Sequence, residues 1–303
     1  MEPNWALARK RQNLQKRARI VQTIRAFFAE RDYLEVETPH RIPGNAPEAH
    51  IDPVPSGSWC LHTSPELAMK RLLAAGYERT FQLCRCWREG ERGANHLPEF
   101  TLLEWYRAGA DYTALMTECE ALLAALLPGG KATWQGHAID LAAPWQRLSV
   151  REAFDRYAPM PLDRALASER FEEVLTEYVE PRLGQGRPTF LYDYPLELGA
   201  LARTKPDDPT VAERFELYIA GLEIANAFSE LTDPAEQRER FMQDEKSRRA
   251  AGKKPYPFPE KFLCELEAMP EAAGIALGVD RLVMLLTGAE AIDEVVAFTP
   301  EEL

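Results

Sequence analysis

Ionisable residues interrupt several apolar stretches of the chain, where a charged group is costly unless it is paired or bound to a ligand. Within the segment 100–108, which we predict to be a strand, Glu104 and Tyr106 stand two residues apart and so share one face. An acid and a tyrosine on one face could together hold an ammonium group. A solvent-facing strand edge is the alternative, and the residues alone leave both open.

A second group of polar residues lies in the apolar segment 215–231. Glu216, Glu223, Asn226 and Glu230 interrupt a strand-like pattern there. Several carboxylates in one such run indicate a site for Mg²⁺ or for a cationic ligand. A surface strand that carries acids is the alternative.

Two short motifs lie where helices are predicted to begin. Ser64-Pro65-Glu66 offers an N-cap, a first-turn proline and a first-turn acid, and taken alone it is most simply a helix start. The motif from Gly278 to Arg281 places an arginine in the first turn of another helix. A helix N-terminus together with arginine suits an anion or a stacked planar base.

The cysteines give a weaker signal. Cys84 and Cys86 form a C-x-C pair on a predicted strand, so both thiols face the same way. No second C-x-C or C-x-x-C completes a zinc site, and ordinary buried cysteines are the favoured interpretation. The sequence also has no P-loop, no G-x-S-x-G elbow and no H-E-x-x-H motif.

Composition limits the class of protein. The chain has 303 residues, and 36 basic against 48 acidic side chains give a net charge of −12. Its longest apolar run is too short for a membrane span, and five cysteines are too few for a disulfide scaffold, so we expect a reduced cytoplasmic protein. The only basic concentration, at residues 9–19, is most simply a solvated helix face. Extensive tRNA or DNA binding is therefore disfavoured.

Hydrophobic periodicity predicts the elements that position these residues. We expect helices at about 13–31, 64–75, 234–251 and 279–286, further helices within 111–185, and a proline-rich loop at 39–55. Strands are expected at 33–39, 80–87, 100–108, 190–194 and 275–278, with 80–87 and 100–108 forming a long antiparallel hairpin. Strands separated by helices predict one α+β layered domain, since no linker is long enough to force a division.

Together these motifs resemble the three signature motifs of class II aminoacyl-tRNA synthetases, most closely those of the lysyl branch. Residues of about 13–40 resemble motif 1, residues 80–108 resemble motif 2, and residues 274–287 resemble motif 3. The segments 64–66 and 221–231 also match lysyl-type cores, and the resemblance covers about residues 13–300. It implies an α+β catalytic domain with an antiparallel sheet flanked by helices, dimeric through the motif 1 region.

The resemblance implies a role for each matching position. Arg88 and Arg281 are the implied catalytic residues, and Arg88 would hold the ATP α-phosphate and the substrate carboxylate. Phe100 and Arg281 would sandwich the adenine, and His96 would hold the outer phosphates. The positions implied to bind ATP are Arg88, His96, Phe100, Glu223, Ile224, Gly278 and Arg281. Those implied to bind the amino acid are Ser64, Pro65, Glu66, Glu104, Tyr106, Asn226, Glu230 and Ala276. Mg²⁺ is implied at Glu216 and Glu223.

Bacterial lysyl enzymes carry an anticodon-binding barrel before motif 1. Only about a dozen residues precede that motif here, so we expect no such domain. A lysyl-like core of this length resembles the subfamily of stand-alone ligases that attach (R)-β-lysine to elongation factor P. The resemblance implies an ATP-dependent, AMP-forming ligase with elongation factor P as its protein acceptor. A core that charges tRNA or a small acceptor, and a regulatory paralogue without turnover, are the alternatives.

Three positions depart from the family pattern. Gly90 stands where motif 2 usually has an acid, with Glu91 beside it, and Leu97 replaces the asparagine common before Pro-Glu-Phe. Ala276 stands where lysyl-tRNA synthetases carry glycine, as it does in the stand-alone subfamily. We expect this methyl group to influence which lysine isomer is activated.

Overall fold

A long antiparallel hairpin of β5 (Arg79–Trp87) and β6 (Glu99–Ala108) confirms the predicted pair of strands. The computed structural model describes residues 5–303. Along β6, Leu103 and Trp105 face an apolar core, whereas Glu104 and Tyr106 face the opposite side of the sheet and are hydrogen-bonded to each other. The period-2 assignment of the two faces is therefore confirmed.

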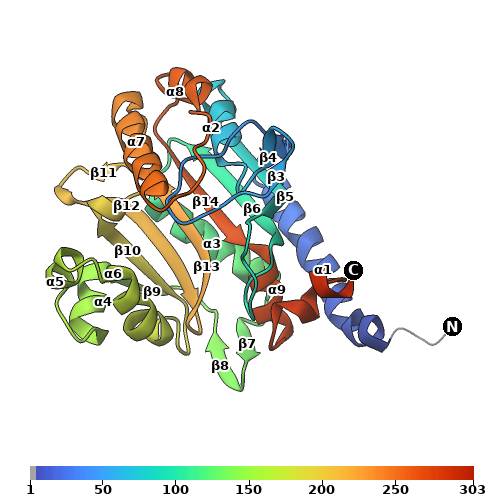
Figure 1. Cartoon of the computed structure of the whole chain (residues 1–303). Helices are drawn as coiled ribbons and strands as arrows, with labels where there is room; N and C mark the ends of the chain where they lie inside the picture. Colours follow the sequence, from blue (N-terminus) through green and yellow to red (C-terminus); the bar gives the residue numbers. More distant parts are fainter. Residues whose placement is uncertain (1–4) are drawn as a thin grey trace.

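The hairpin belongs to a nine-stranded sheet in the order β1-β5-β6-β14-β13-β12-β10-β9, with β11 paired to β12 (Figure 1). The other strands are β1 (Leu34–Glu35), β9 (Gln146–Ser149), β10 (Thr189–Pro195), β11 (Thr204–Lys205), β12 (Asp208–Ile219), β13 (Leu222–Ser229) and β14 (Ala272–Gly278). The central pairs are antiparallel, as expected, but β1–β5 and β9–β10 at the two edges are parallel. The sheet is therefore mixed, because long connections rather than hairpins lead into both edge pairs.

Helices and two small sheets surround this sheet. The helices are α1 (Trp5–Ala29), α2 (Glu66–Ala74), α3 (Tyr112–Leu126), α4 (Val150–Tyr157), α5 (Leu162–Ala167), α6 (Phe171–Val174), α7 (Pro234–Ala250), α8 (Glu260–Leu266) and α9 (Val279–Thr287). The small sheets contain β2 (Arg41–Ile42), β3 (Pro55–Ser56) and β4 (Trp59–Leu61), and β7 (Lys131–Trp134) with β8 (His137–Asp140). Within the described residues, no helix is long and apolar enough to cross a membrane.

Several predicted boundaries are wrong. Helix α1 begins at Trp5, well before residue 13, because the polar stretch ahead of its apolar stripe also consists of good helix formers. The strand expected at 33–39 shrinks to β1, and the strands β7, β8 and β9 were missed within 111–185. Pro65 is the N-cap of α2 rather than a first-turn residue. The segment 215–231 is not one run but a hairpin, which turns at Ala220 and Gly221 with positive φ.

The two faces of the sheet carry separate apolar clusters. On one face, α1, α3 and α9 cover a large core in which Phe28 stacks on Phe81 at a ring separation of 4.8 Å and packs against Trp105. On the other face, α2, α7 and α8 pack around a smaller cluster that includes Tyr106 and Phe241. The smaller cluster leaves room on this second face for polar groups.

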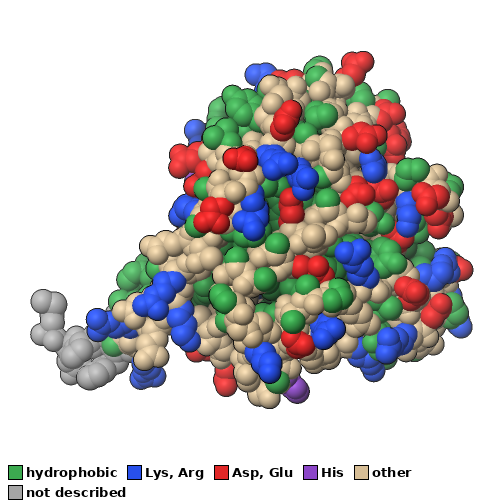
Figure 2. Space-filling model, turned by 180° about the vertical axis from the view of Figure 1, so that it is seen from behind, with side chains coloured by type: hydrophobic (Ala, Val, Ile, Leu, Met, Phe, Trp, Pro, Cys, Tyr) green, Lys and Arg blue, Asp and Glu red, His purple; other side chains and the backbone are tan. Residues whose placement is uncertain are grey.

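The basic residues near the N-terminus all lie on α1, as predicted. Lys10 pairs with Glu302 at 2.7 Å and Arg17 pairs with Asp280 at 2.5 Å, so part of this charge is used within the fold. Over the face seen in Figure 2, basic and acidic side chains are interspersed. The low affinity for nucleic acid expected from the net charge stays a prediction.

Asp280 joins three elements of the fold. Its carboxylate, which is 2% exposed, accepts hydrogen bonds from Arg17 of α1 and, at 2.6 Å, from the backbone N–H of Thr101 on β6. Asp280 itself lies in the first turn of α9, where an acid also favours the helix dipole. This interaction therefore fixes α1 and α9 against the motif 2 strand.

We predict that Asp280→Ala lowers the free energy of unfolding by about 3–5 kcal/mol, because it leaves a largely buried arginine and an amide without their partner. Asp163→Ala is the matched control, since Asp163 pairs with Arg151 on the surface. That change should cost less than about 1 kcal/mol. Urea unfolding of both variants measures the difference, and equal losses would contradict the role given to Asp280.

Candidate active site

A row of registered residues crosses the centre of the sheet on the face opposite the large core. Glu216 on β12 is paired with Asn226 on β13, and Asn226 is paired with Ala276 on β14. Ala276 is in turn paired with Glu104 on β6. Side chains paired in this way lie about 5 Å apart. Strand pairing thus brings four predicted residues, distant in sequence, into one line.

A pocket of about 670 Å³ opens over the part of this row formed by Asn226, Ala276 and Glu104. Helix α7, which passes in front of the sheet in Figure 1, contributes Phe241 and Asp244 to its wall, and the segment 46–51 contributes another part. The predicted residues that line it are Ser64, Glu66, Arg88, Glu104, Tyr106, Asn226 and Ala276. Most of the expected amino-acid site is therefore gathered in one pocket.

Glu104 lies at the floor of the pocket, and both of its carboxylate oxygens accept hydrogen bonds. The Ser64 hydroxyl donates to one oxygen at 2.6 Å and the Tyr106 hydroxyl donates to the other at 2.9 Å. Burial, together with the nearby charge of Glu66, raises the pKa of Glu104 well above its usual value. The ionised form of this carboxyl group therefore needs a cation that the surrounding residues do not supply.

Lys70 is a site residue that the sequence analysis missed. This lysine is 1% exposed, and its Nζ lies 2.6 Å from Glu66 Oε1 and 2.5 Å from Glu230 Oε2. Although burial opposes its charge, the carboxylates of Glu230 and Glu66 raise the pKa of Lys70. The spacing of Glu66 and Lys70 on α2 was the available signal, since residues four apart share a helix face.

Glu230 lies behind the pocket wall rather than in it. Burial raises its pKa to about 7, although Lys70 opposes this shift. Gly274 makes the arrangement possible: a Cβ there would lie 2.2 Å from Tyr106 Cε1 and 2.4 Å from Glu230 Oε1. The first glycine of the motif 3 segment is thus required by the close approach of two site residues.

Three residues predicted to bind ATP meet at the other end of the site. Arg281, in the first turn of α9, donates from Nη1 to the backbone oxygen of Glu223 at 2.9 Å and to its carboxylate at 3.2 Å. Its Nη2 lies 2.5 Å from Nε2 of His96. Burial and the Arg281 charge lower the pKa of His96, so the imidazole is neutral at pH 7.

Arg88 keeps free hydrogen-bonding capacity. Its guanidinium lies 5.0 Å from the centre of the Phe100 ring, and its nearest acid is Glu91 at 3.6 Å. The buried Nε of Arg88 has no hydrogen-bond partner, which leaves this donor available to a phosphate or carboxylate. In this structure Phe100 therefore faces Arg88, and Arg281 is paired with Glu223 and His96.

Glu216, which is buried, and Glu223, which is partly exposed, form an acidic pair. Glu216 accepts hydrogen bonds of 2.6 Å from Tyr194, Tyr218 and Arg214. Burial and the charge of Glu216 raise the pKa of Glu223. Mutual repulsion of this kind, between oxygen ligands of the type that Mg²⁺ prefers, fits a site for a divalent cation.

The remaining residues predicted to bind ligands cap helices or pack into the core. Pro65 is the N-cap of α2 and Gly278 is the N-cap of α9. The side chain of Ile224 packs into the large core, on the face away from the pocket, so only its backbone is directed toward the site. Arg214, which the sequence analysis missed, joins Glu216 to Asn226 through a second hydrogen bond of 3.2 Å.

A mixed sheet with motif 2 and motif 3 strands at its centre, and a pocket of paired acids and arginines on one face, is the arrangement of a class II synthetase core. The family model of class II tRNA synthetases (D, K and N) matches residues 5–302, so the chain belongs to this family.

Its curated relatives define a narrower group. The chain is 42% identical to the elongation factor P–(R)-β-lysine ligase of Klebsiella pneumoniae, covering 95% of this chain and 94% of the relative. It is likewise 42% identical to the enzyme of that name from Erwinia tasmaniensis, over 98% and 97% of the two chains. The enzyme of that name from Salmonella gallinarum is 41% identical over 97% of each chain.

We predict that Glu104→Gln weakens binding of the amino acid by about 3–5 kcal/mol, because the amide keeps the shape but leaves a buried cation without its counter-charge. ATP binding should change less than about threefold, which is under 1 kcal/mol. Glu99→Gln, at the exposed start of the same strand, is the control and should leave both affinities unchanged. Calorimetric titration tests this, and equal weakening for both ligands would place Glu104 outside the side-chain pocket.

Proposed function

We propose that the chain is an ATP-dependent ligase that activates (R)-β-lysine as an acyl-adenylate and transfers it to a lysine side chain of elongation factor P. The names of its relatives support this acceptor and this amino acid. The family supports the use of ATP. We further propose that residues 1–303 act as one catalytic domain in the cytoplasm.

The charge balance of the pocket is the observation that carries the choice of substrate class. The ammonium group of Lys70 pairs with two carboxyl groups, those of Glu66 and Glu230, whereas Glu104 is hydrogen-bonded only to hydroxyl groups. Burial raises the pKa of Glu104 and Glu230, so their ionised forms need further positive charge. Lysine and its β-isomer each bring a side-chain ammonium group that would supply this positive charge at Glu104.

In the first step, a carboxylate oxygen of β-lysine attacks the α-phosphorus of ATP. A new P–O bond forms, the bond to the bridging oxygen breaks, and pyrophosphate leaves. We assign Arg88 to the α-phosphate and the attacking carboxylate, because its buried Nε has no hydrogen-bond partner within the protein. Arg281 and His96 would bind the nucleotide from the end of the pocket where they now contact each other.

In the second step, the lysine amine of the acceptor attacks the acyl carbon of the adenylate. The C–N bond forms, the C–O bond to phosphate breaks, AMP leaves, and the amine loses a proton to solvent. No protein nucleophile is needed, so catalysis would come from positioning and from neutralising phosphate charge. Mg²⁺, for which we propose Glu216 and Glu223 as ligands, supplies part of that neutralisation when bound.

We also propose a homodimer formed through the motif 1 region. Strand β1 is an edge strand of the sheet, and Leu34 on it is 50% exposed. An exposed apolar residue on a sheet edge favours contact with another chain. Light scattering coupled to size-exclusion chromatography would measure a mass twice that of the chain.

The decisive experiment combines an exchange assay with an acceptor assay. ATP–pyrophosphate exchange should depend on (R)-β-lysine. The intact mass of elongation factor P should rise by the mass of one β-lysyl group. Reductively methylated elongation factor P, whose amines are blocked but still charged, is the control and should gain nothing. Acylation of tRNA in place of the protein, or tight tRNA-specific binding at physiological salt, would contradict the proposal.

We predict that Glu223→Gln abolishes adenylate formation with the fold intact, because it removes a charged ligand of Mg²⁺. Glu213→Gln is the control: Glu213 lies on the neighbouring strand and pairs with Arg203 at 2.7 Å. Pyrophosphate exchange should survive in the control. Activity of Glu223→Gln within about tenfold of wild type, ~1.4 kcal/mol of barrier, would show that the metal assignment is wrong.

We predict that Ala276→Gly raises kcat/KM for α-lysine relative to β-lysine by roughly tenfold or more. The methyl group of Ala276 lies in the pocket between Asn226 and Glu104, where it limits the space for an amine near the carboxylate. Ala273→Gly, on the core face of the same strand, should leave the ratio unchanged. An unchanged ratio in a folded Ala276→Gly variant would remove this residue from isomer selection.

A further inference from the structure

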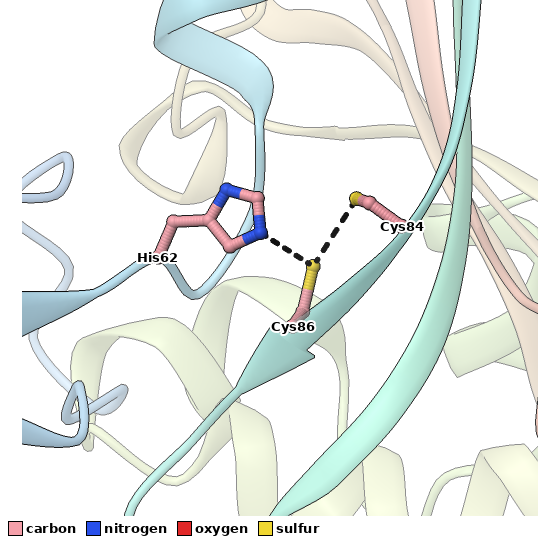
Figure 3. Close-up of side chains that lie close together, drawn as sticks. All are labelled: His62, Cys84 and Cys86. Carbon is pink, nitrogen blue, oxygen red and sulfur yellow. Dashed lines mark hydrogen bonds between the residues drawn. The ribbon is translucent and has the colours of Figure 1, made fainter. Parts of the chain in front are cut away.

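Two thiols and one imidazole meet in a buried cluster beside the pocket. Cys84 and Cys86 lie on β5, and His62 lies directly after β4. In Figure 3 the three side chains point toward a common centre. Cys86 Sγ lies 3.9 Å from Cys84 Sγ and 3.8 Å from His62 Nε2, and the three ligand atoms all lie within 4.8 Å of one another.

These separations agree with the edges of a tetrahedral metal site. Zn²⁺ binds thiolate sulfur at about 2.3 Å and imidazole nitrogen at about 2.0–2.1 Å, which places two sulfurs about 3.8 Å apart and sulfur and nitrogen about 3.6 Å apart. Two of the three observed separations, 3.9 and 3.8 Å, are close to these values. We propose that Cys84, Cys86 and His62 bind a thiophilic divalent metal ion, Zn²⁺, with solvent at the fourth position.

The surroundings hold the three ligands in place. The ring of His62 packs against those of His40 and Trp87, with centres 5.0 and 5.8 Å away. Leu102 and Phe100 are among the apolar residues that pack against the two thiols. An apolar shell of this kind controls solvent access to a metal. Cys84 also lines a second cavity, beside β5, which offers a path for the ion.

Binding of the metal ion would replace a hydrogen bond of His62 by a bond to the metal. Nε2 of His62 lies 2.6 Å from the backbone oxygen of Arg85, to which it donates a hydrogen bond. On binding, the imidazole proton moves from Nε2 to Nδ1, the thiol protons pass to solvent, and no electron is transferred. Because His62 precedes Ser64 and Cys86 precedes Arg88 by two residues each, the ion would join two segments of the pocket.

The test uses the full chain, purified under reducing conditions, loaded with Zn²⁺ or Co²⁺ and then dialysed. We expect one equivalent of bound metal by elemental analysis, and thiolate-to-metal charge-transfer absorption in the Co²⁺ form. Cys86→Ser should lose stoichiometric binding. Cys119→Ser, a buried cysteine on α3, and Cys264→Ser, an exposed one, are the controls and should keep it.

The metal-binding measurements do not depend on catalysis, so their results can be told apart from those of the activity assays. Wild-type protein without an equivalent of metal, or Cys86→Ser that binds the ion as tightly, overturns the proposal. The Co²⁺ spectrum of the wild-type chain needs no variant to fold, and absence of charge-transfer absorption there also overturns it. A Cys84–Cys86 disulfide that forms in place of metal binding has the same consequence.

Discussion

Burial of three carboxyl groups with one ammonium group, which pairs with only two of them, is the constraint on which the rest of the site depends. Charged groups removed from water are costly unless they are paired, so Lys70 and the hydroxyls of Ser64 and Tyr106 are necessary parts of the pocket. The opposite face of the same strands is filled by apolar side chains beneath α1, α3 and α9. That packing stabilises the sheet enough for its other face to remain incompletely neutralised.

The sequence predicts the chemistry of this site better than its geometry. Period-2 alternation placed Glu104 and Tyr106 on one face, and the structure confirms it. Lys70 could have been found from its helical spacing to Glu66, but a buried lysine is unusual enough that its tertiary partners decide the matter. Nothing local indicates that Gly274 must admit two side chains, because Tyr106 and Glu230 approach it from segments distant in sequence.

Long helices and strands are easier to predict from the sequence than short ones. The strands β5 and β6 repeat their alternation often enough to be recognised, α7 is a long run of charged helix formers, and the structure confirms all three. Strands of four residues, as in β7–β9, are too short to show a period, and α1 was shortened because its first turns lack an apolar stripe. The parallel edges of the sheet depend on long-range contacts that no window of sequence contains.

Arg214 couples the two ends of the site. Its guanidinium donates to Glu216 at 2.6 Å and to Asn226 Oδ1 at 3.2 Å, and so connects the acidic pair with the amino-acid pocket. Because a guanidinium is planar and rigid, neither partner is able to move far without shifting the other. The tyrosines that donate to Glu216 restrict it further. Strand register sets the spacing of these groups before any ligand arrives, and a site arranged in this way stabilises developing charge without reorganising at the moment of reaction.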